Sequence, residues 1–216
     1  MIYVKNYPAP EWNERECLRY AGTTPQNICV EEQALFEACV AEVDNKLPYK
    51  VCWGRFPVKK AGNILDFGFF QTDSSALMKN LEGCEEVIVF AATIGLEIDR
   101  LIRRYTSLSP AKALFFQAIG AERIESLCDA FCEELKKDGL QLRPRFSPGY
   151  GDLPMELQKD IFRVLDCPRK IGLALNDSLL MSPSKSVTAI IGIGEGTEEA
   201  DNKCSACEKS DCAYRG

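Results

Sequence analysis

The amino-acid sequence predicts an α+β fold with a mixed, largely antiparallel sheet and flanking helices, one of them a long central helix. Strand-like apolar runs and amphipathic helical stretches are both present, but they do not alternate strictly, which disfavours a doubly wound fold. One helical stretch begins at Ser109-Pro110, an N-cap followed by proline at the first helical position, and ends at Gly139. At about 1.5 Å per residue it is roughly 40 Å long, which makes it the expected spine of the domain.

The segment before residue 85 is expected to form two helices, a β-hairpin and a short third helix. Gly22 ends the first helix, and Pro48 follows the second. Alternating apolar residues then predict a strand, which a turn near Gly62 joins to a second strand. The expected elements are helices 11–22 and 30–46, strands 49–56 and 64–70, and a helix from 73 to 83.

The segment after residue 85 begins with a continuous apolar run, EVIVFAA, which is typical of a buried strand. An amphipathic helix and the long helix follow, and then shorter elements around a turn rich in proline and glycine. The expected elements are strand 86–92, helix 96–105, the long helix 109–138, strand 140–146, helix 154–165, and strands 171–176 and 186–194.

The chain is expected to fall into three parts. Residues 1–75 hold the N-terminal helices and hairpin, either within the main domain or as a small subdomain, and residues 76–194 form the core. Residues 195–216 are an acidic segment without apolar periodicity, expected to be a linker, followed by a cysteine-rich tail.

Composition excludes several classes of function. The net charge of −6 disfavours nucleic acid as a partner, and no apolar run reaches the roughly 18 to 20 residues of a membrane span. Eleven cysteines without a signal-peptide core in residues 1–20 indicate reduced thiols or metal ligands, and therefore a cytoplasmic protein. The chain has no histidine, which excludes Ser-His-Asp and Cys-His catalysis. No catalytic residue is assigned.

The turn after the long helix, RPRFSPGYGD, is unusually constrained. The planar fork of Arg145 can pair with a carboxylate, while Pro148 fixes φ and Gly149 lets backbone amides approach a ligand. Tyr150 offers a ring for stacking, and Asp152 can accept from a ribose diol. These residues would suit a zwitterionic ligand with an aromatic ring and a ribose. The alternative is an ordinary strand-end turn, in which Asp152 caps the next helix and Arg145 forms a surface ion pair.

The stretch RFSPGYGDLP resembles the activation-domain motif of cobalamin-dependent methionine synthases, in which an Arg-x-x-x-Gly-Tyr element binds S-adenosylmethionine (AdoMet). Further stretches resemble free-standing proteins of this family in the same order, and together they cover roughly residues 80–194. They are VIVFAATIGLEIDRLIRR, SPAKALFFQAIGAERIESLCDAF and LLMSPSKSVTAIIGIG.

The resemblance implies a domain that binds AdoMet and docks over the corrinoid of a partner, where it supports reductive methylation of cob(II)alamin. Arg145 would hold the ligand carboxylate, Pro148 and Gly149 would shape the backbone under it, and Tyr150 would line the site. A carboxylate from the long helix is also expected, either Glu122 or Glu125. The cobalamin itself would be held by the partner, in keeping with the lack of histidine here.

The C-terminal cysteines form a second candidate site. Cys204-x-x-Cys207-x-x-x-x-Cys212 places three thiols close enough to surround one metal. The alternatives are an iron–sulfur cluster, a structural zinc, or free thiols. A metal would need a fourth ligand, for which Cys84 and Cys167 are candidates.

The leading interpretation is thus an AdoMet-binding reactivation subunit in a cobalamin-dependent methyltransferase system, and whether the chain itself is an enzyme stays open. Its expected partners are a methionine synthase that lacks its own activation domain, or another corrinoid protein, and an electron donor. The cationic helix face of Arg100, Arg103 and Arg104 is either solvated or meets an acidic partner. Two alternative functions are a corrinoid-protein docking adaptor without AdoMet and an iron–sulfur electron-transfer accessory.

Overall fold

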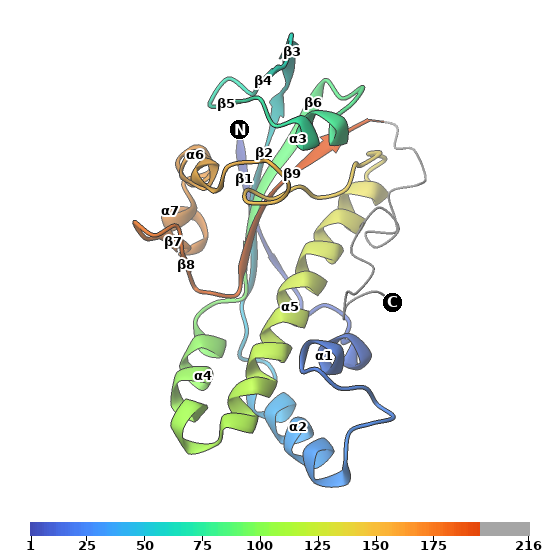
Figure 1. Ribbon diagram of the computed structural model, residues 1–216, viewed down its shortest axis with the longest axis vertical. Coiled ribbons are helices and arrows are strands. Elements are labelled where there is room, and N and C mark those ends of the chain that lie inside the picture. Colours follow the sequence, from blue (N-terminus) through green and yellow to red (C-terminus); the bar gives the residue numbers. More distant parts are fainter. Residues whose placement is uncertain (195–216) are drawn as a thin grey trace.

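The computed structural model describes residues 1–194, and its central feature is a four-stranded sheet (Figure 1). Each neighbouring pair of strands in it is antiparallel. The strands, in spatial order, are β1 (Ile2–Tyr7), β2 (Tyr49–Pro57), β6 (Glu86–Thr93) and β9 (Ser186–Ile193). With helices on both faces of this antiparallel sheet, the predicted α+β class is confirmed.

Strand β6 is apolar throughout because both of its faces are buried. Ile88, Phe90 and Ala92 point into one hydrophobic cluster, and the alternate residues Val87 and Val89 point into another. Side chains alternate between the two faces of a strand, so a strand covered on both sides becomes a continuous apolar run. The sheet therefore separates two cores.

The long helix α5 (Pro110–Lys137) lies across one face of the sheet, and the chain begins it at Ser109-Pro110 as expected (Figure 1). Phe131 of α5 packs against Phe90 of β6 and Trp53 of β2, with ring centroids 5.0 and 5.3 Å apart. Three shorter helices pack around α5: α1 (Glu14–Tyr20), α2 (Val30–Val43) and α4 (Glu97–Leu108).

The opposite face of the sheet is covered by α6 (Gln158–Leu165) and α7 (Cys167–Ile171), which follow a short 3-10 helix, η1 (Met155–Leu157). The remaining elements are small: β3 (Lys59–Ala61), β4 (Ile64–Asp66), β5 (Gln71–Thr72) and α3 (Ser75–Asn80) lie at one end of the sheet, and β7 (Ala174–Leu175) and β8 (Met181–Ser182) lie beside α7 (Figure 1). Within residues 1–194, no helix combines the length and the apolar character needed to cross a membrane.

The predicted strand 140–146 is wrong in part. This segment runs beside β9 but pairs with it only through two isolated bridges, at Leu142 and Phe146. Pro144 lies between them and has no N–H to donate, so a continuous ladder cannot form. The segment nevertheless keeps its place at the sheet edge, because the N–H of Phe146 donates to the carbonyl of Ile190 at 2.9 Å and the carbonyl of Phe146 accepts from the N–H of Ile190 at 2.8 Å.

Two other predicted strands are shorter than expected, and strands β1, β3, β5 and β8 were not predicted. The 64–70 segment turns at Gly68, where φ is +80°, so that β4 and β5 pair with each other. In the 171–176 segment, α7 extends to Ile171 and leaves only β7 as a two-residue strand. Strand β1 was not predicted, because its middle residues are exposed and give no alternating pattern.

Candidate functional site

The side chain of Arg145 joins the edge of the sheet to the long helix. Its neighbour Phe146 is fixed to β9, and the Arg145 guanidinium reaches α5. Nη2 donates to Oε2 of Glu125 at 2.9 Å, and Nη1 lies 2.8 Å from Oδ1 of Asp129. Glu125 and Asp129 are one turn apart on α5 and therefore share one face of the helix. The structure thus brings together Arg145 and one of the two helix carboxylates predicted from the sequence.

Arg145 is sheltered, whereas its two partners face solvent. The side chain of Arg145 is 15% exposed, compared with 42% for Glu125 and 69% for Asp129. Burial acts to lower the pKa of the Arg145 guanidinium, but the thiol of Cys128 and the carboxylates of Asp129 and Glu125 more than offset it and raise the pKa. The guanidinium is therefore a permanent cation at the rim of the molecule.

The turn that follows Arg145 is held by its own backbone. The N–H of Gly149 donates to the carbonyl of Leu153 at 2.8 Å, and φ of Gly149 is +85°. This positive φ favours glycine, and a Cβ at Gly149 would lie 2.3 Å from the terminal methyl of Met155, which would have to move aside. Pro148, just before it, is buried, whereas Tyr150, just after it, is 65% exposed. This backbone holds a tyrosine ring out at the surface.

The ring of Tyr150 is supported from below by Phe146. The two centroids are 5.3 Å apart and the planes are nearly perpendicular, at 86°. Because Phe146 follows Arg145 directly, the ring and the guanidinium belong to one short segment of chain. Consecutive side chains of an extended segment point to opposite faces, so Arg145 contacts α5 whereas Phe146 packs in the cluster on the α6 side.

Asp152 caps a helix that lies far upstream in the sequence. Its carboxylate accepts from the N–H and Oγ of Ser75, both at 2.7 Å, from the N–H of Ala76 at 3.2 Å, and from Oγ of Ser74. These contacts hold the pKa of Asp152 far below its usual range, the hydroxyls of Ser74 and Ser75 contributing most. The capped helix is α3, and not the helix that follows Asp152 as one sequence alternative supposed.

Glu122, the other predicted helix carboxylate, precedes Glu125 by three residues on α5 but is buried rather than partly exposed. It is 1% exposed and pairs with the guanidinium of Arg123, and Oε1 accepts from Oγ of Ser126 at 2.7 Å and from the N–H of Asn13 at 3.2 Å. Arg123 in turn donates to the carbonyl of Pro10 at 2.8 Å. This cluster fastens the N-terminal segment to α5.

The cysteines proposed as metal ligands lie in two different situations. Those of the tail are outside the described residues: Cys204, Cys207 and Cys212. Within residues 1–194, no group of three or more cysteine, aspartate or glutamate side chains is placed to hold a metal ion. Of the two candidates for a fourth ligand, Cys167 is fully buried beside Cys52, whose thiol together with burial raises the pKa of Cys167. Cys84 is partly exposed, beside Gly192.

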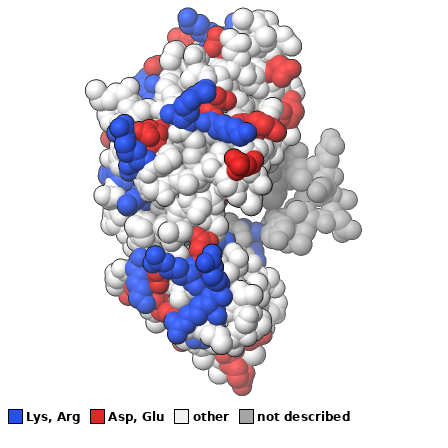
Figure 2. Space-filling view, turned by 90° about the vertical axis from the view of Figure 1, so that its left-hand side faces the viewer, with Lys and Arg blue, Asp and Glu red and all other residues white. Residues whose placement is uncertain are grey.

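Basic side chains gather on α4. Figure 2 shows Lys and Arg over the lower part of the face that carries α4 in Figure 1. Arg100 and Arg104 are 72% and 64% exposed, and their carboxylate partners Glu97 and Glu42 lie 3.5 and 3.8 Å away. The cationic helix face predicted from the sequence is thus exposed and only loosely paired at these two positions.

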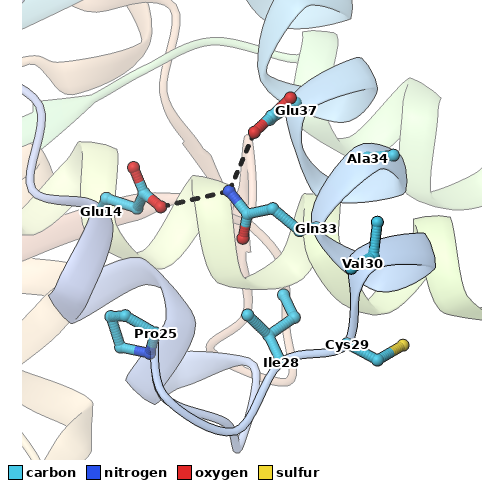
Figure 3. Close-up of a pocket in the computed structure, with 8 residues that line it drawn as sticks. All are labelled: Glu14, Pro25, Ile28, Cys29, Val30, Gln33, Ala34 and Glu37. Atoms are coloured by element: carbon cyan, nitrogen blue, oxygen red, sulfur yellow. Dashed lines mark hydrogen bonds between the residues drawn. The ribbon is translucent and has the colours of Figure 1, made fainter.

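Two hollows lie away from the Arg145 edge. One, of about 450 Å³, lies between α1 and α2, where the amide of Gln33 donates to Glu14 at 3.4 Å and to Glu37 at 3.0 Å (Figure 3). The other, of about 360 Å³, is lined by Trp12 and by Arg123, whose donors already bond to Glu122 and to backbone carbonyls. In both, the polar groups named here are bonded within the protein.

These features define a class of domain: a four-stranded antiparallel sheet, a long helix packed across one face, and an arginine held between the sheet edge and that helix. Among solved structures, the chain matches a crystal structure of the MetH reactivation domain bound to AdoHcy (S-adenosylhomocysteine), with a TM-score of 0.66. The two are 18% identical, and the match covers 92% of this chain and 80% of that one. The resemblance seen in the sequence is confirmed at the level of the fold. No family model and no curated protein matches the sequence.

Sequence reasoning missed Asp129. The signal that could have identified it is the spacing, because Asp129 follows Glu125 by one helical turn and both must lie on the same side of a helix. The residue type alone gives no such indication, since exposed acidic residues are common on long helices.

Proposed function

We propose that this protein binds AdoMet at Arg145 and acts as a reactivation subunit for a cobalamin-dependent methyltransferase. The observation that carries the proposal is a sheltered guanidinium at the sheet edge, in a fold shared with a domain whose crystal structure contains AdoHcy. AdoHcy and AdoMet differ by one methyl group and carry the same amino-acid carboxylate, which is the group that an arginine fork recognises.

The geometry around Arg145 suits such a ligand. Asp129, which lies 2.8 Å from Nη1 of Arg145, is 69% exposed, and ion pairs of exposed groups contribute only about 0–1 kcal/mol, so a ligand carboxylate can compete with it for Nη1. Gly149 and Pro148 form the backbone next to this position, and the exposed ring of Tyr150 offers a face to the adenine. Glu125, the helix carboxylate nearest to Arg145, orients the guanidinium.

Two of the residues predicted from the sequence are left out of the direct ligand contacts. The oxygens of Asp152 are occupied by the start of α3, and Glu122 is buried against Arg123. Both support the site indirectly: Asp152 fixes the end of the Gly149–Tyr150 turn, and Glu122 fixes α5. The ligand site therefore consists of Arg145, Glu125, Pro148, Gly149 and Tyr150.

The chemistry would be supplied by the ligand and the partner. In the proposed reaction, an external donor would supply one electron to the cob(II)alamin of the partner. AdoMet would supply the methyl group, leaving the electron pair of its carbon–sulfur bond on sulfur, so the products would be methylcobalamin and AdoHcy. The task of this chain is to bind and orient AdoMet at an exposed edge that a corrinoid protein can cover.

The proposed partner is a methionine synthase without its own reactivation domain, or another corrinoid protein. The exposed arginines of α4 provide a surface that an acidic partner could contact (Figure 2). Mixing the protein with the corrinoid partner, AdoMet and a chemical reductant, and following the cob(II)alamin absorbance, measures reactivation directly.

Calorimetry tests AdoMet binding without the partner. The wild type and Arg145→Ala are titrated with AdoMet, and Arg163→Ala serves as the control because Arg163 is an exposed arginine of α6 that pairs with Asp160 on the same helix. We expect the wild type and the control to bind alike. Arg145→Ala should lose well over tenfold in affinity, because an unpaired ligand carboxylate costs on the order of 2–5 kcal/mol.

The two failures of this experiment have different meanings. Equal binding by the wild type and Arg145→Ala would reject Arg145 as the carboxylate-binding residue. Absence of binding by the wild type would reject the AdoMet proposal and favour the docking adaptor. Iron and sulfide analysis of anaerobically purified protein tests the third interpretation separately, and iron-free protein would reject an iron–sulfur accessory role.

A further inference from the structure

The cluster around Arg145 has an excess of negative charge. Arg145 supplies one positive charge and contacts two carboxylates, Glu125 and Asp129, so the three groups together carry a net charge of −1. The same field reaches the neighbouring helix α1. Burial raises the pKa of the Tyr20 hydroxyl, and the charges of Glu125, Glu16 and Asp129 raise it further. A cationic group of a ligand close to these carboxylates is therefore stabilised.

The two carboxylates are not equivalent. Glu125 accepts a well-aligned hydrogen bond from Nη2 of Arg145 at 2.9 Å. Asp129 lies 2.8 Å from Nη1, but this atom makes no aligned hydrogen bond within residues 1–194, and the Asp129 side chain is 69% exposed. Glu125 is therefore the residue that fixes the guanidinium, whereas Asp129 is free to turn toward a ligand without disturbing it.

AdoMet and AdoHcy differ in charge as well as in one methyl group. Both carry the α-ammonium and the carboxylate, which cancel, but only AdoMet has a sulfonium, so AdoMet is a cation and AdoHcy is neutral overall. A ligand whose carboxylate pairs with Arg145 brings its ammonium and sulfur within a few bonds of that contact. A nearby carboxylate with no other aligned hydrogen bond stabilises the cation and does little for the neutral product.

We propose that Asp129 is a specificity-determining residue that makes the site prefer AdoMet to AdoHcy. The proposal rests on the proposed function. Arg145 and Glu125 neutralise each other, so the negative charge of Asp129 has no counter-charge in this cluster. The sulfonium of AdoMet would neutralise it. Loss of the methyl group removes that compensation, so the product leaves more readily than the substrate.

The test is the ratio of two dissociation constants, for AdoMet and AdoHcy, measured by calorimetry on the wild type and on Asp129→Asn, Asp129→Glu and Asp160→Asn. Asp129→Asn should weaken AdoMet binding about three- to fivefold and AdoHcy binding less than about twofold, because one partly solvated charge is lost. Asp129→Glu should retain the preference. Asp160→Asn removes the same charge from α6, on the opposite face of the sheet, and should leave both constants unchanged.

Salt dependence gives a second readout that a purely structural role would not produce. Added salt should weaken AdoMet binding more in the wild type than in Asp129→Asn, since the lost interaction is between exposed charges. Equal effects of Asp129→Asn on AdoMet and AdoHcy, or none on either, would overturn the inference while leaving AdoMet binding in place. A wild type that binds neither ligand would overturn the proposed function and this inference together.

Discussion

Arg145 at the edge of the sheet is paired with Glu125 of the long helix α5, with Nη2 of the arginine 2.9 Å from Oε2 of the glutamate. Glu122, less than one turn earlier on the same helix, points into the core and binds Arg123 instead. The sequence resemblance left these two glutamates as alternatives, and the structure gives them separate tasks. One lies at the candidate ligand site, and the other holds the N-terminal segment.

This division predicts opposite effects for two matched substitutions. Glu122→Gln should lower the free energy of unfolding by about 3–5 kcal/mol, because it leaves the buried Arg123 without its counter-charge. Glu125→Gln should change stability by less than about 1 kcal/mol, since its pair is partly exposed, but should weaken AdoMet binding. Urea unfolding and calorimetry on both variants measure the two effects. The reverse pattern would mean that Glu122, and not Glu125, contributes to ligand binding.

A second prediction concerns the acid stability that Asp152 confers. Its pKa is lowered in the folded state, so its stabilising contribution is present above the unfolded pKa of about 3.9 and is lost as the pH falls toward the folded value. Asp152→Asn should lower the urea midpoint at pH 7, and the gap to the wild type should close below about pH 4. A gap that stays constant with pH would show that the carboxylate charge is not what caps α3.

A third prediction separates backbone strain from steric conflict at Gly149. Gly149 and Gly139 have nearly the same φ, +85° and +86°, but only at Gly149 would an added Cβ collide, with Met155. Gly139→Ala should therefore lower the free energy of unfolding by about 1–2 kcal/mol through backbone strain alone, and Gly149→Ala should lower it further. Adding Met155→Ala to Gly149→Ala should recover only the part of the stability loss by which Gly149→Ala exceeds Gly139→Ala. Identical costs at the two glycines would argue that Met155 moves aside freely.

A fourth prediction concerns the exposed ring of Tyr150. Tyr150→Ala should leave stability nearly unchanged, because the ring is 65% exposed, but should weaken AdoMet binding by several-fold to about tenfold if the ring stacks on adenine. Tyr150→Phe keeps the ring and should bind nearly as well as the wild type. If the phenylalanine variant is as weak as the alanine variant, the hydroxyl and not the ring contacts the ligand.

Long elements with a strong local signal were predictable from the sequence. The N-cap and proline at Ser109-Pro110 located the start of α5, and the apolar run of β6 located the central strand. Elements that depend on tertiary pairing were not. Strand β1 is an exposed edge strand that forms only because β2 lies beside it, and Pro144 limits the 140–146 segment to two bridges.

For the candidate site, the local turn was predictable from the sequence, but the partners of its residues were not. The spacing of Arg145, Gly149 and Tyr150 identified the turn, because each residue type has a local reason to be there. The partners of these residues could not be read from the sequence. Asp152 binds the start of α3, which precedes it by more than seventy residues, and the choice of Glu125 over Glu122 depends on how α5 is rotated against the sheet.

The most direct test of the account is a crystal structure of the protein with AdoMet or AdoHcy bound. We predict that the ligand carboxylate lies within hydrogen-bonding distance of both terminal nitrogens of Arg145, with the adenine beside Tyr150 and Glu125 still bonded to the guanidinium. A ligand bound elsewhere, with Arg145 still paired only to Glu125 and Asp129, would contradict it.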